Sequence, residues 1–397
     1  MATSSRTGHV VIVGAGVGGL TAAVALYQRG WQLTVLEQAD RLAPVGSGIA
    51  LFPNALRALD AIGVGAQLRS GGQSEFGVGI RRPSGRWLSR ANDSAAVRRH
   101  GPSVLAHRAD LIDLLHRAVP AGAVVTGTRV AGDAITTGGS GPATVRYPGG
   151  TITADLVVAA DGVHSLQRSR LFPGCPGPRY AGYTTWRLVV PLDLGPDGAA
   201  GAETWGRGQR FGSARLPDKR TYCYASATTD AGQHADDSEL AEVRARFGDW
   251  HDPIPALLAA ATPDTVVRTD VYEQRIPLPS YVTGRVALLG DAAHAMAPDL
   301  GQGGGQAMED AVTLAATLTD HSSVPAALAR YDELRRPRTQ RVVRLAHRIG
   351  TAAHLRNRFA VAGRDAILAT VPPAAGAHLL NPILDWTPPP PPDTRST

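Results

Sequence analysis

The sequence predicts an α/β fold with a parallel sheet and covering helices, an inserted antiparallel sheet and a C-terminal helical segment. Apolar strand patterns begin near residues 9, 155 and 285, and each is followed by a glycine-containing turn and a helical pattern. Such continuous apolar runs are typical of parallel strands that are buried on both faces. From about residue 180 to 274 the pattern changes to shorter strand-like stretches, which favours an antiparallel sheet. At 397 residues the chain has room for two joined domains.

Composition and charge narrow the possible functions. The net charge is +6, but the basic residues are scattered and form no block interleaved with aromatic residues, so we expect no nucleic acid partner. Cys175 and Cys223 are far apart and belong to no paired motif, which argues against a metal site or redox disulfide and fits a reducing cytoplasm. No apolar run approaches the roughly 18–20 residues that cross a bilayer, so we expect no membrane span.

A strand, a glycine-rich turn, a helix and a second strand open the chain. Residues 9–13 are apolar and mostly β-branched, and Gly14-Ala-Gly-Val-Gly-Gly19 follows at once. In this spacing Gly14 makes the tight turn, Gly16 lets the backbone approach a pyrophosphate, and Gly19 lets helix and strand pack closely. The positive N-terminal end of the helix favours the phosphates, and Glu37, at the end of the second strand, is placed to accept hydrogen bonds from a ribose. This unit is Rossmann-like and leaves NAD and FAD both open.

Two later segments repeat the arrangement of strand and turn. Residues 155–165 predict a buried strand that ends in Asp161-Gly162, with Ser165 as the N-cap of a helix, although a simple strand-helix corner fits equally well. Residues 285–318 are more specific, because a strand, Asp291, a proline bend, a loop with four glycines and a helix from about residue 306 follow one another. Asp291 follows the carboxyl end of its strand, where open α/β sheets bind ligands. The helix N-terminus suits an anionic group such as the N1–C2=O edge of a reduced flavin.

These three motifs, in this order, resemble those of the FAD-dependent aromatic hydroxylase family, the class A flavoprotein monooxygenases. Closer similarity to the urate, hydroxynicotinate and salicylate hydroxylase branch rests on two phrases, Pro44-Val-Gly-Ser-Gly-Ile-Ala-Leu-Phe-Pro-Asn-Ala-Leu-Arg-Ala-Leu and Tyr180-Ala-Gly-Tyr-Thr-Thr-Trp-Arg. The resemblance covers about residues 8 to 340. It implies non-covalent FAD, with NADH or NADPH as cosubstrate and no separate nicotinamide domain. The sequence agrees, because it has no second glycine-rich motif after a strand.

The resemblance also implies roles for single residues. It assigns the N-terminal glycines to the pyrophosphate, Glu37 to the adenosine ribose and Asp291 to the ribityl chain of the flavin. Arg108 matches a family arginine that reaches FAD, the Val130 backbone is expected to meet adenine, and Asp161-Gly162 serves both FAD and NAD(P)H. The predicted cofactor-binding residues are Gly14, Gly16, Val17, Gly19, Glu37, Gln38, Arg108, Val130, Asp161, Gly162, Asp291, Pro298, Gly301, Gln302, Gly303 and Gly304.

The reaction of the family implies a hydroxylated aromatic or heteroaromatic product. FAD is reduced by NAD(P)H, forms a flavin hydroperoxide with O2, and passes one oxygen atom to an electron-rich ring in a cavity that excludes water. Arg210 and Tyr222 align with the substrate-binding arginine and tyrosine of the urate branch, and the alternative is a surface arginine and a tyrosine that packs in the sheet. Thr185 stands where that branch has an amide side chain, which argues against urate. His164 and His294 lie inside cofactor motifs, and we expect structural roles for both.

The pattern of motifs predicts how the chain divides. We expect an FAD-binding domain of residues 8–75, 101–178 and 283–337, and a substrate domain of residues 76–100 and 179–282. Residues 338–387 are predicted to be helical and 388–397 to form a flexible tail, and we expect a monomer or a homodimer.

Other functions remain open on the sequence. An epoxidase or another oxidative tailoring enzyme of secondary metabolism shares the same motifs, as does a flavin reductase or saturase that adds hydrogen. A non-catalytic FAD-binding regulator is the alternative outside enzymes. A halogenase needs a substrate-side lysine, and the sole lysine, Lys219, lies in a predicted turn, while a disulfide reductase needs paired cysteines. O2 consumption coupled to NAD(P)H oxidation distinguishes a monooxygenase from a reductase or a regulator.

Overall fold

A computed structural model of the chain describes residues 8–42, 47–70, 79–90, 94–137, 141–195, 202–321 and 323–389. The beginning of the phrase at Pro44, the junction predicted at residues 75 and 76, and most of the predicted tail lie outside these ranges.

A six-stranded sheet carries all three glycine-turn motifs. Its strands are parallel except for the edge strand β17, and the central ones are fully buried, as their continuous apolar sequence predicts. In sheet order the strands are β17 (Val282–Thr283), β18 (Val286–Leu288), β11 (Leu156–Ala159), β1 (His9–Val13), β2 (Gln32–Leu36) and β7 (Val124–Val125). The strands of the three motifs, β18, β11 and β1, are therefore direct neighbours.

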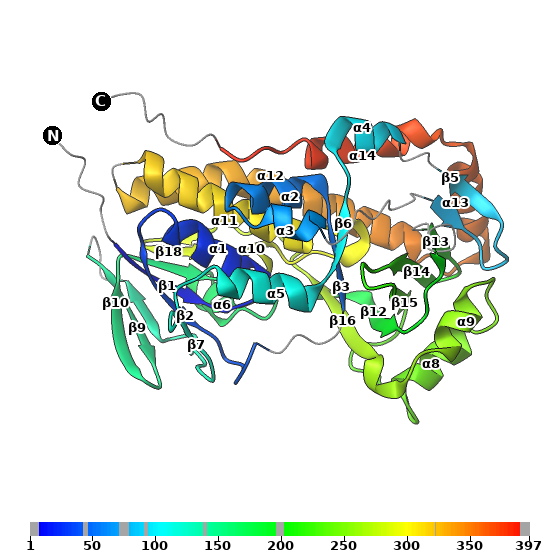
Figure 1. The fold of residues 1–397 in the computed structure, drawn as a ribbon, viewed down its shortest axis with the longest axis horizontal. Helices are drawn as coiled ribbons and strands as arrows, with labels where there is room; N and C mark the ends of the chain where they lie inside the picture. Colours follow the sequence, from blue (N-terminus) through cyan, green and yellow to red (C-terminus); the bar gives the residue numbers. More distant parts are fainter. Residues whose placement is uncertain are drawn as a thin grey trace.

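A seven-stranded sheet forms the other half of the molecule, on the right in Figure 1. In sheet order its strands are β16 (Val267–Glu273), β12 (Arg179–Val190), β15 (Thr221–Ala227), β14 (Gln209–Arg215), β13 (Ala202–Trp205), β4 (Gly79–Arg81) and β5 (Trp87–Arg90). The antiparallel sheet predicted from the short strand-like stretches is present, but β4 pairs with β13 in parallel. This parallel pair arises because β4 comes from a distant part of the chain and adds to the edge of the sheet.

The remaining strands form two smaller sheets. An antiparallel ribbon of β8 (Ile135–Thr137), β9 (Ala143–Tyr147) and β10 (Gly150–Ala154) lies at the far left of Figure 1. A two-stranded pair, β3 (Gly48–Leu51) and β6 (Val104–His107), lies between the two large sheets.

Helices cover both large sheets. Those around the six-stranded sheet include α1 (Val17–Tyr27), α2 (Pro53–Ala61), α3 (Gly65–Ser70), α5 (Arg108–Arg117), α6 (Leu166–Leu171), α10 (Asp291–His294) and α11 (Gly303–Asp320). The seven-stranded sheet is covered on one face by α8 (Glu239–Phe247) and α9 (Ile254–Ala259). The remaining elements are α4 (Ser94–His100), α12 (Val324–Ala353), α13 (Arg358–Thr370), α14 (Pro373–Leu384) and the 3-10 turns η1 (Pro263–Thr265) and η2 (Pro298–Leu300).

Long helices join the two halves. Helix α12 runs along the top of Figure 1 from the six-stranded sheet to the seven-stranded one, and α13 and α14 return over the same side. The helical C-terminal segment is thus confirmed, as is the α/β class. Helix α12 passes without interruption through the border predicted between residues 337 and 338, with Pro337 inside the helix.

Candidate active site

The ends of the three motifs meet at one edge of the six-stranded sheet. Strands β18, β11, β1 and β2 run parallel and lie side by side, so the residues that follow each of them emerge together. In this row Asp291 follows β18, Asp161 follows β11, the glycine turn follows β1, and Glu37 follows β2. We call this the cofactor edge.

The glycine turn after β1 needs its glycines for different reasons. Gly14 has φ of +100°, and a Cβ atom there would lie 2.4 Å from the Ala160 carbonyl oxygen. A Cβ atom at Gly19 would lie 1.9 Å from the Gly14 carbonyl oxygen, so helix and turn touch at that point. A Cβ atom at Gly16, by contrast, would meet no protein atom within 4 Å. The open space in front of Gly16, at the N-terminus of α1, fits a bound phosphate.

Glu37 closes the turn from the neighbouring strand. Its carboxylate accepts hydrogen bonds from the backbone N–H groups of Ala15, at 2.7 Å, and Ala39, at 2.8 Å. Each oxygen keeps lone pairs for a ribose hydroxyl, since one carboxylate offers about four acceptor positions. Gln38 beside it is exposed, Val17 is the buried first residue of α1, and Val130 is buried in the main core.

Asp161 shapes the second turn. Its oxygens accept from the Ser165 hydroxyl at 2.5 Å and from the Gln167 backbone N–H at 3.2 Å, and Ser165 caps α6 as predicted. Gly162 has φ of +79°. The buried guanidinium of Arg168 donates to the carbonyls of Val163 and Ala292, and so ties this turn to the segment after β18.

Asp291 is available for a ligand. Its side chain is exposed and makes no hydrogen bond or ion pair with another described residue, and a Cβ atom at Gly303 would lie 3.9 Å from its Oδ1. A carboxylate at the carboxyl end of a strand, beside a helix N-terminus, is suited to hold hydroxyl groups of a polyol. Gly290 before it has φ of +63°, which lets the chain turn into α10.

The glycine-rich segment differs from the prediction. Helix α11 begins at Gly303, whereas a helix from about residue 306 was expected, so Gly303, Gly304 and Gly305 form its first turn. No side chain caps this end, and the three N–H groups find no acceptor within the described part of the chain. Gly301 makes the preceding bend with φ of +62° after Pro298 starts η2. The bare N–H groups and the positive helix end suit a negatively charged ring edge.

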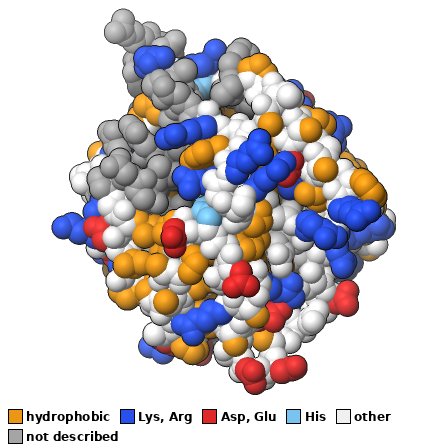
Figure 2. All heavy atoms as spheres, turned by 90° about the vertical axis from the view of Figure 1, so that its right-hand side faces the viewer, with side chains coloured by type: hydrophobic (Ala, Val, Ile, Leu, Met, Phe, Trp, Pro, Cys, Tyr) orange, Lys and Arg blue, Asp and Glu red, His pale blue; other side chains and the backbone are white. Residues whose placement is uncertain are grey.

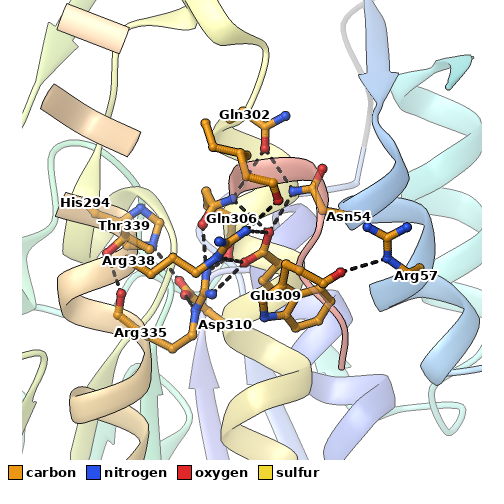
Figure 3. A network of polar contacts seen from close by, with 12 residues as sticks. Asn54, Arg57, His294, Gln302, Gln306, Glu309, Asp310, Arg335, Arg338 and Thr339 are labelled. Atoms are coloured by element: carbon orange, nitrogen blue, oxygen red, sulfur yellow. Dashed lines mark hydrogen bonds and ion pairs between the residues drawn. The ribbon is translucent and has the colours of Figure 1, made fainter. Parts of the chain in front are cut away.

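A buried network supports this helix end from behind (Figure 3). Glu309 accepts from Asn54 Nδ2 at 2.7 Å, Arg335 Nη1 at 2.6 Å and Arg338 Nε at 2.7 Å. Asn54 also donates to the Gln302 side chain at 2.9 Å. The Gln302 side chain therefore belongs to this network.

His294 belongs to the same support. It is buried, and its Nε2 lies 2.6 Å from Asp310, which also accepts from Arg335. Burial alone would raise the pKa of Asp310, but the charges of His294 and Arg335 lower it below its usual value. The structural role expected for His294 agrees with these contacts, while His164 is exposed and packs edge-on against Tyr272.

Arg108 connects the cofactor edge with the seven-stranded sheet. It begins α5 and its side chain is exposed, yet surrounding protein lowers its pKa, and repulsion from Arg187 lowers the pKa further. Asp291 and Tyr222 act in the opposite direction, so all four groups lie close together.

The two faces of the seven-stranded sheet differ in character. One face carries Trp186, Leu188, Phe211 and Cys223 and packs on α8 and α9 as an apolar core. The pairing register places Arg187, Tyr222 and Tyr224 together on the opposite face. We call this the polar face, and its remaining members include Glu203, Trp205, Arg210 and Ser226.

Tyr222 lies where the polar face meets the cofactor edge. Its ring fills the space above Gly48, where a Cβ atom would come within 2.6 Å of the ring. The next residue, Ile49, approaches Gly304 at the start of α11. Burial raises the pKa of Tyr222, and the nearby charge of Arg187 reduces this rise without reversing it. Arg187 was not chosen from the sequence, although its alternation with Tyr183 and Thr185 on one strand places it on this face.

Arg210 is enclosed by acids instead of being free. It is buried, donates to Asp299 at 2.7 Å, and forms an ion pair with Glu203. Tyr224 donates to the same Glu203, and Tyr183 donates to Asp299 at 2.5 Å. The sequence could not reveal this pairing, because Asp299 lies 89 positions away in η2. Arg210 thus links the polar face to the loop that leads into α11.

His354 is a further residue at the polar face, and the sequence did not indicate it. Its ring stacks on Tyr183 with centroids 3.8 Å apart, its Nδ1 lies 2.9 Å from the Gly350 carbonyl oxygen, and its Nε2 lies 2.9 Å from the Ser226 hydroxyl. Burial lowers the pKa of His354, so the ring is neutral near pH 7. A neutral ring donates from Nδ1 to the carbonyl and accepts at Nε2 from the hydroxyl.

Comparison with known proteins identifies the family. The model of the FAD binding domain family matches residues 7–346. The chain belongs to this family of FAD-dependent aromatic hydroxylases. It is 38% identical over 360 residues to an aurachin C monooxygenase/isomerase of Stigmatella aurantiaca, with 90% of this chain and 93% of that protein covered. A 2-heptyl-3-hydroxy-4(1H)-quinolone synthase of Mycobacteroides abscessus is 35% identical, with 86% and 90% covered.

A solved structure agrees with this assignment. HpxO of Klebsiella pneumoniae, complexed with FAD and uric acid, superimposes with a TM-score of 0.85 at 29% identity and covers 96% of this chain and 97% of its own. The resemblance predicted from the motifs is confirmed, and with it the cofactor FAD and the cosubstrate NAD(P)H. The protein is an FAD-dependent monooxygenase. In the described residues no helix is long and apolar enough to cross a membrane, and no cluster of metal-binding side chains occurs.

Proposed function

We propose that this monooxygenase acts on a fused, nitrogen-containing aromatic ring of the 4-quinolone type. The observation that carries the proposal is the group of Arg108, Arg187 and Tyr222 at the junction of cofactor edge and polar face. Two cationic side chains favour the anionic form of a ring oxygen, and that form enriches the neighbouring carbon in electrons. Tyr222 offers a flat aromatic surface for the ring. The relative from Mycobacteroides abscessus is named for a heptyl quinolone, and this name supports the class.

The cofactor edge fits FAD. We propose that the N-terminus of α1 at Gly16 would hold the pyrophosphate, Glu37 the adenosine ribose and Asp291 the ribityl chain, while the first turn of α11 would face the flavin ring. The proposed set also includes Gly14, Val17, Gly19, Gln38, Arg108, Val130, Asp161, Gly162, Pro298, Gly301 and Gln302. FAD held here would supply the redox chemistry between NAD(P)H and O2. For each turnover, substrate, O2, NAD(P)H and one proton yield oxygenated product, NAD(P)⁺ and water.

The residues of the chain position the ring and hold charge. Arg187 lies diagonally across the strand pair from Tyr222 and would supply positive charge beside the substrate oxygen. Arg210 remains a candidate at this site, and we propose that it acts through Asp299, which it holds beside the start of α11. We place the reaction in the cytoplasm, where NAD(P)H is supplied and where free Cys175 and Cys223 are expected.

Epoxidation of the same ring is the second candidate. The relative from Stigmatella aurantiaca is named a monooxygenase/isomerase, and an epoxide can rearrange into an isomeric product. Both reactions consume the same reagents, so only the position of the new oxygen in the product separates them.

A substrate screen tests the proposal. The holoenzyme is mixed with 2-heptyl-4(1H)-quinolone, urate or 6-hydroxynicotinate under 18O-labelled O2, and NADH and NADPH oxidation, O2 uptake and product mass are measured. We expect the quinolone to stimulate NAD(P)H oxidation and O2 uptake in equal amounts. We also expect the product to contain one labelled oxygen atom. Turnover of urate alone would contradict the quinolone class, and reduction of a substrate without O2 uptake would indicate a reductase.

Variants test the assigned group. Arg187→Ala should retain FAD yet lose at least about tenfold in kcat/KM, because one charge-assisted contact contributes about 1.5–3 kcal/mol. Arg246→Ala, on α8 beyond the apolar face, is the matched control and should keep the kcat/KM of the parent. Equal kcat/KM in both variants would remove Arg187 from the site.

A further inference from the structure

Helix α13 has its polar and apolar sides reversed. It buries Arg364 and Asp365, while Phe359 is 70% exposed and Ile367 is 62% exposed. A surface helix normally turns its apolar stripe toward the core and its charges toward water. Among the described residues these two are the most exposed large hydrophobic side chains.

Ion pairs hold the helix in this orientation. The Arg364 guanidinium donates to the carbonyl oxygens of Gly206, Ala352 and Ala353, and it pairs with Asp365 at 2.8 Å. Asp365 also pairs with Arg82, which directly follows β4, at 2.9 Å. The inner side of α13 is thus fixed to the end of α12 and to the edge of the seven-stranded sheet, so the apolar side cannot rotate inward.

The exposed apolar residues form one line. Phe359, Gly363 and Ile367 follow one another at intervals of four, which places them on the same side of α13, and the exposed Val371 follows directly after the helix. Exposed alanines flank them, and the only acid of α13, Asp365, is buried. We call this line the α13 stripe. Nothing in the described part of the chain covers it.

Cationic side chains surround the stripe. Arg356 and Arg358 are exposed at the beginning of α13, with the Arg358 guanidinium over the Phe359 ring. Helix α13 packs beside β5, which adds the exposed Arg86 and Arg90 at its two ends. Figure 2 shows this side of the molecule, where orange hydrophobic and blue basic side chains lie next to one another and the red acidic ones lie mainly in the lower half.

We propose that the α13 stripe docks on a membrane surface that carries anionic lipids. An apolar helix side flanked by arginines lies in the plane of the headgroups, with the apolar residues at the acyl boundary and the arginines on the phosphates. A second copy of the chain is a poorer occupant, because it presents the same exposed arginines and its only α13 acid, Asp365, is buried and cannot pair with them. No helix among the described residues can span a bilayer, so the attachment is peripheral.

Sedimentation with vesicles tests this surface. The holoenzyme is mixed at low salt with vesicles of phosphatidylcholine alone or of equal parts phosphatidylcholine and phosphatidylglycerol. We expect at least about tenfold stronger binding to the mixed vesicles, and release at high salt, because screening weakens attraction to the phosphates. Equal binding to both vesicle types, or to neither, would overturn the proposal.

Variants separate the stripe from the rest of the surface. Phe359→Ser with Ile367→Ser, and separately Arg356→Ser with Arg358→Ser, should each weaken binding to mixed vesicles by about tenfold. Tyr27→Ser, at an exposed aromatic on the distant α1, is the matched control and should bind like the parent. Bound FAD and an unchanged melting temperature show that each variant is folded. If the stripe variants bind vesicles like the parent, or if they convert a dimer into a monomer without any vesicle binding, the stripe is not a lipid surface.

Discussion

The cofactor edge and the polar face lie next to each other, but they differ in their hydrogen bonding. The cofactor edge leaves several polar groups without a partner in the described part of the chain, whereas the polar face pairs most of its charged groups. At the cofactor edge, the N–H groups of the first turn of α11 and the carboxylate of Asp291 have no partner among the described residues. On the polar face, Arg210 pairs with both Glu203 and Asp299. The first surface is therefore prepared for a ligand, whereas much of the second is engaged within the protein. The following predictions test this difference.

The largest effect is expected at Arg210. Arg210→Met leaves Glu203 and Asp299 buried without their counter-charge, which should lower the free energy of unfolding by about 3–5 kcal/mol. Urea denaturation followed by circular dichroism measures the change. The control Arg246→Met breaks only a partly exposed pair on α8 and should cost less than about 1 kcal/mol. Parent-like stability together with lost substrate turnover would show instead that Arg210 is free to bind substrate.

Two glycines of one turn should behave differently. Gly19→Ala forces a Cβ atom against the Gly14 carbonyl and should destabilise the apoprotein by about 1–3 kcal/mol or more. Gly16→Ala meets no protein atom, so the apoprotein should melt like the parent while its FAD affinity falls at least about tenfold. Thermal unfolding and flavin fluorescence titration measure the two effects. Unchanged FAD affinity in Gly16→Ala would contradict the phosphate site.

Substitutions of the two cofactor-edge carboxylates, Asp291 and Glu37, should also have different effects on apoprotein stability. Asp291→Ala removes charge-assisted hydrogen bonds of about 1.5–3 kcal/mol to FAD and should leave the apoprotein as stable as the parent, because the Asp291 side chain makes no hydrogen bond or ion pair with another described residue. Glu37→Ala should weaken FAD binding and also lower apoprotein stability, since Glu37 holds the N–H groups of Ala15 and Ala39. Equal apoprotein stabilities in the two variants would refute this distinction.

The smallest effect is expected in the pH dependence of stability, through His354 at the polar face. Burial lowers the pKa of His354 below the usual 6.5, so between these two values the unfolded chain binds a proton that the folded chain does not. Stability is therefore complete above pH 6.5 and declines as pH falls toward the folded pKa, by at most about 1.4 kcal/mol per pH unit. His354→Gln should show a shallower decline in urea denaturation between pH 7.5 and 5.5. The same slope in both proteins would exclude His354 as the cause.

Local sequence determined the cofactor edge to a large extent. The turn at Gly14 to Gly19, the Ser165 cap and the acids Glu37 and Asp291 depend on backbone conformation and on residues a few positions apart, and glycine, serine and acidic residues report such needs directly. The sequence predicted the start of α11 about three residues too late, at residue 306 instead of Gly303. Glycine is a poor helix former, so three glycines in a row did not indicate the first turn of a helix.

Only the tertiary structure decided which charges are free. Arg210 and Arg187 look alike in the sequence, yet Arg210 meets Asp299 from a segment 89 positions away, and Arg187 meets Tyr222 across the sheet. The partners of Glu309 and the reversed sides of α13 likewise depend on segments that are far apart in the chain. Periodicity indicates which residues share a side of a strand or helix, but pairing in a low-dielectric interior depends on which distant group arrives there.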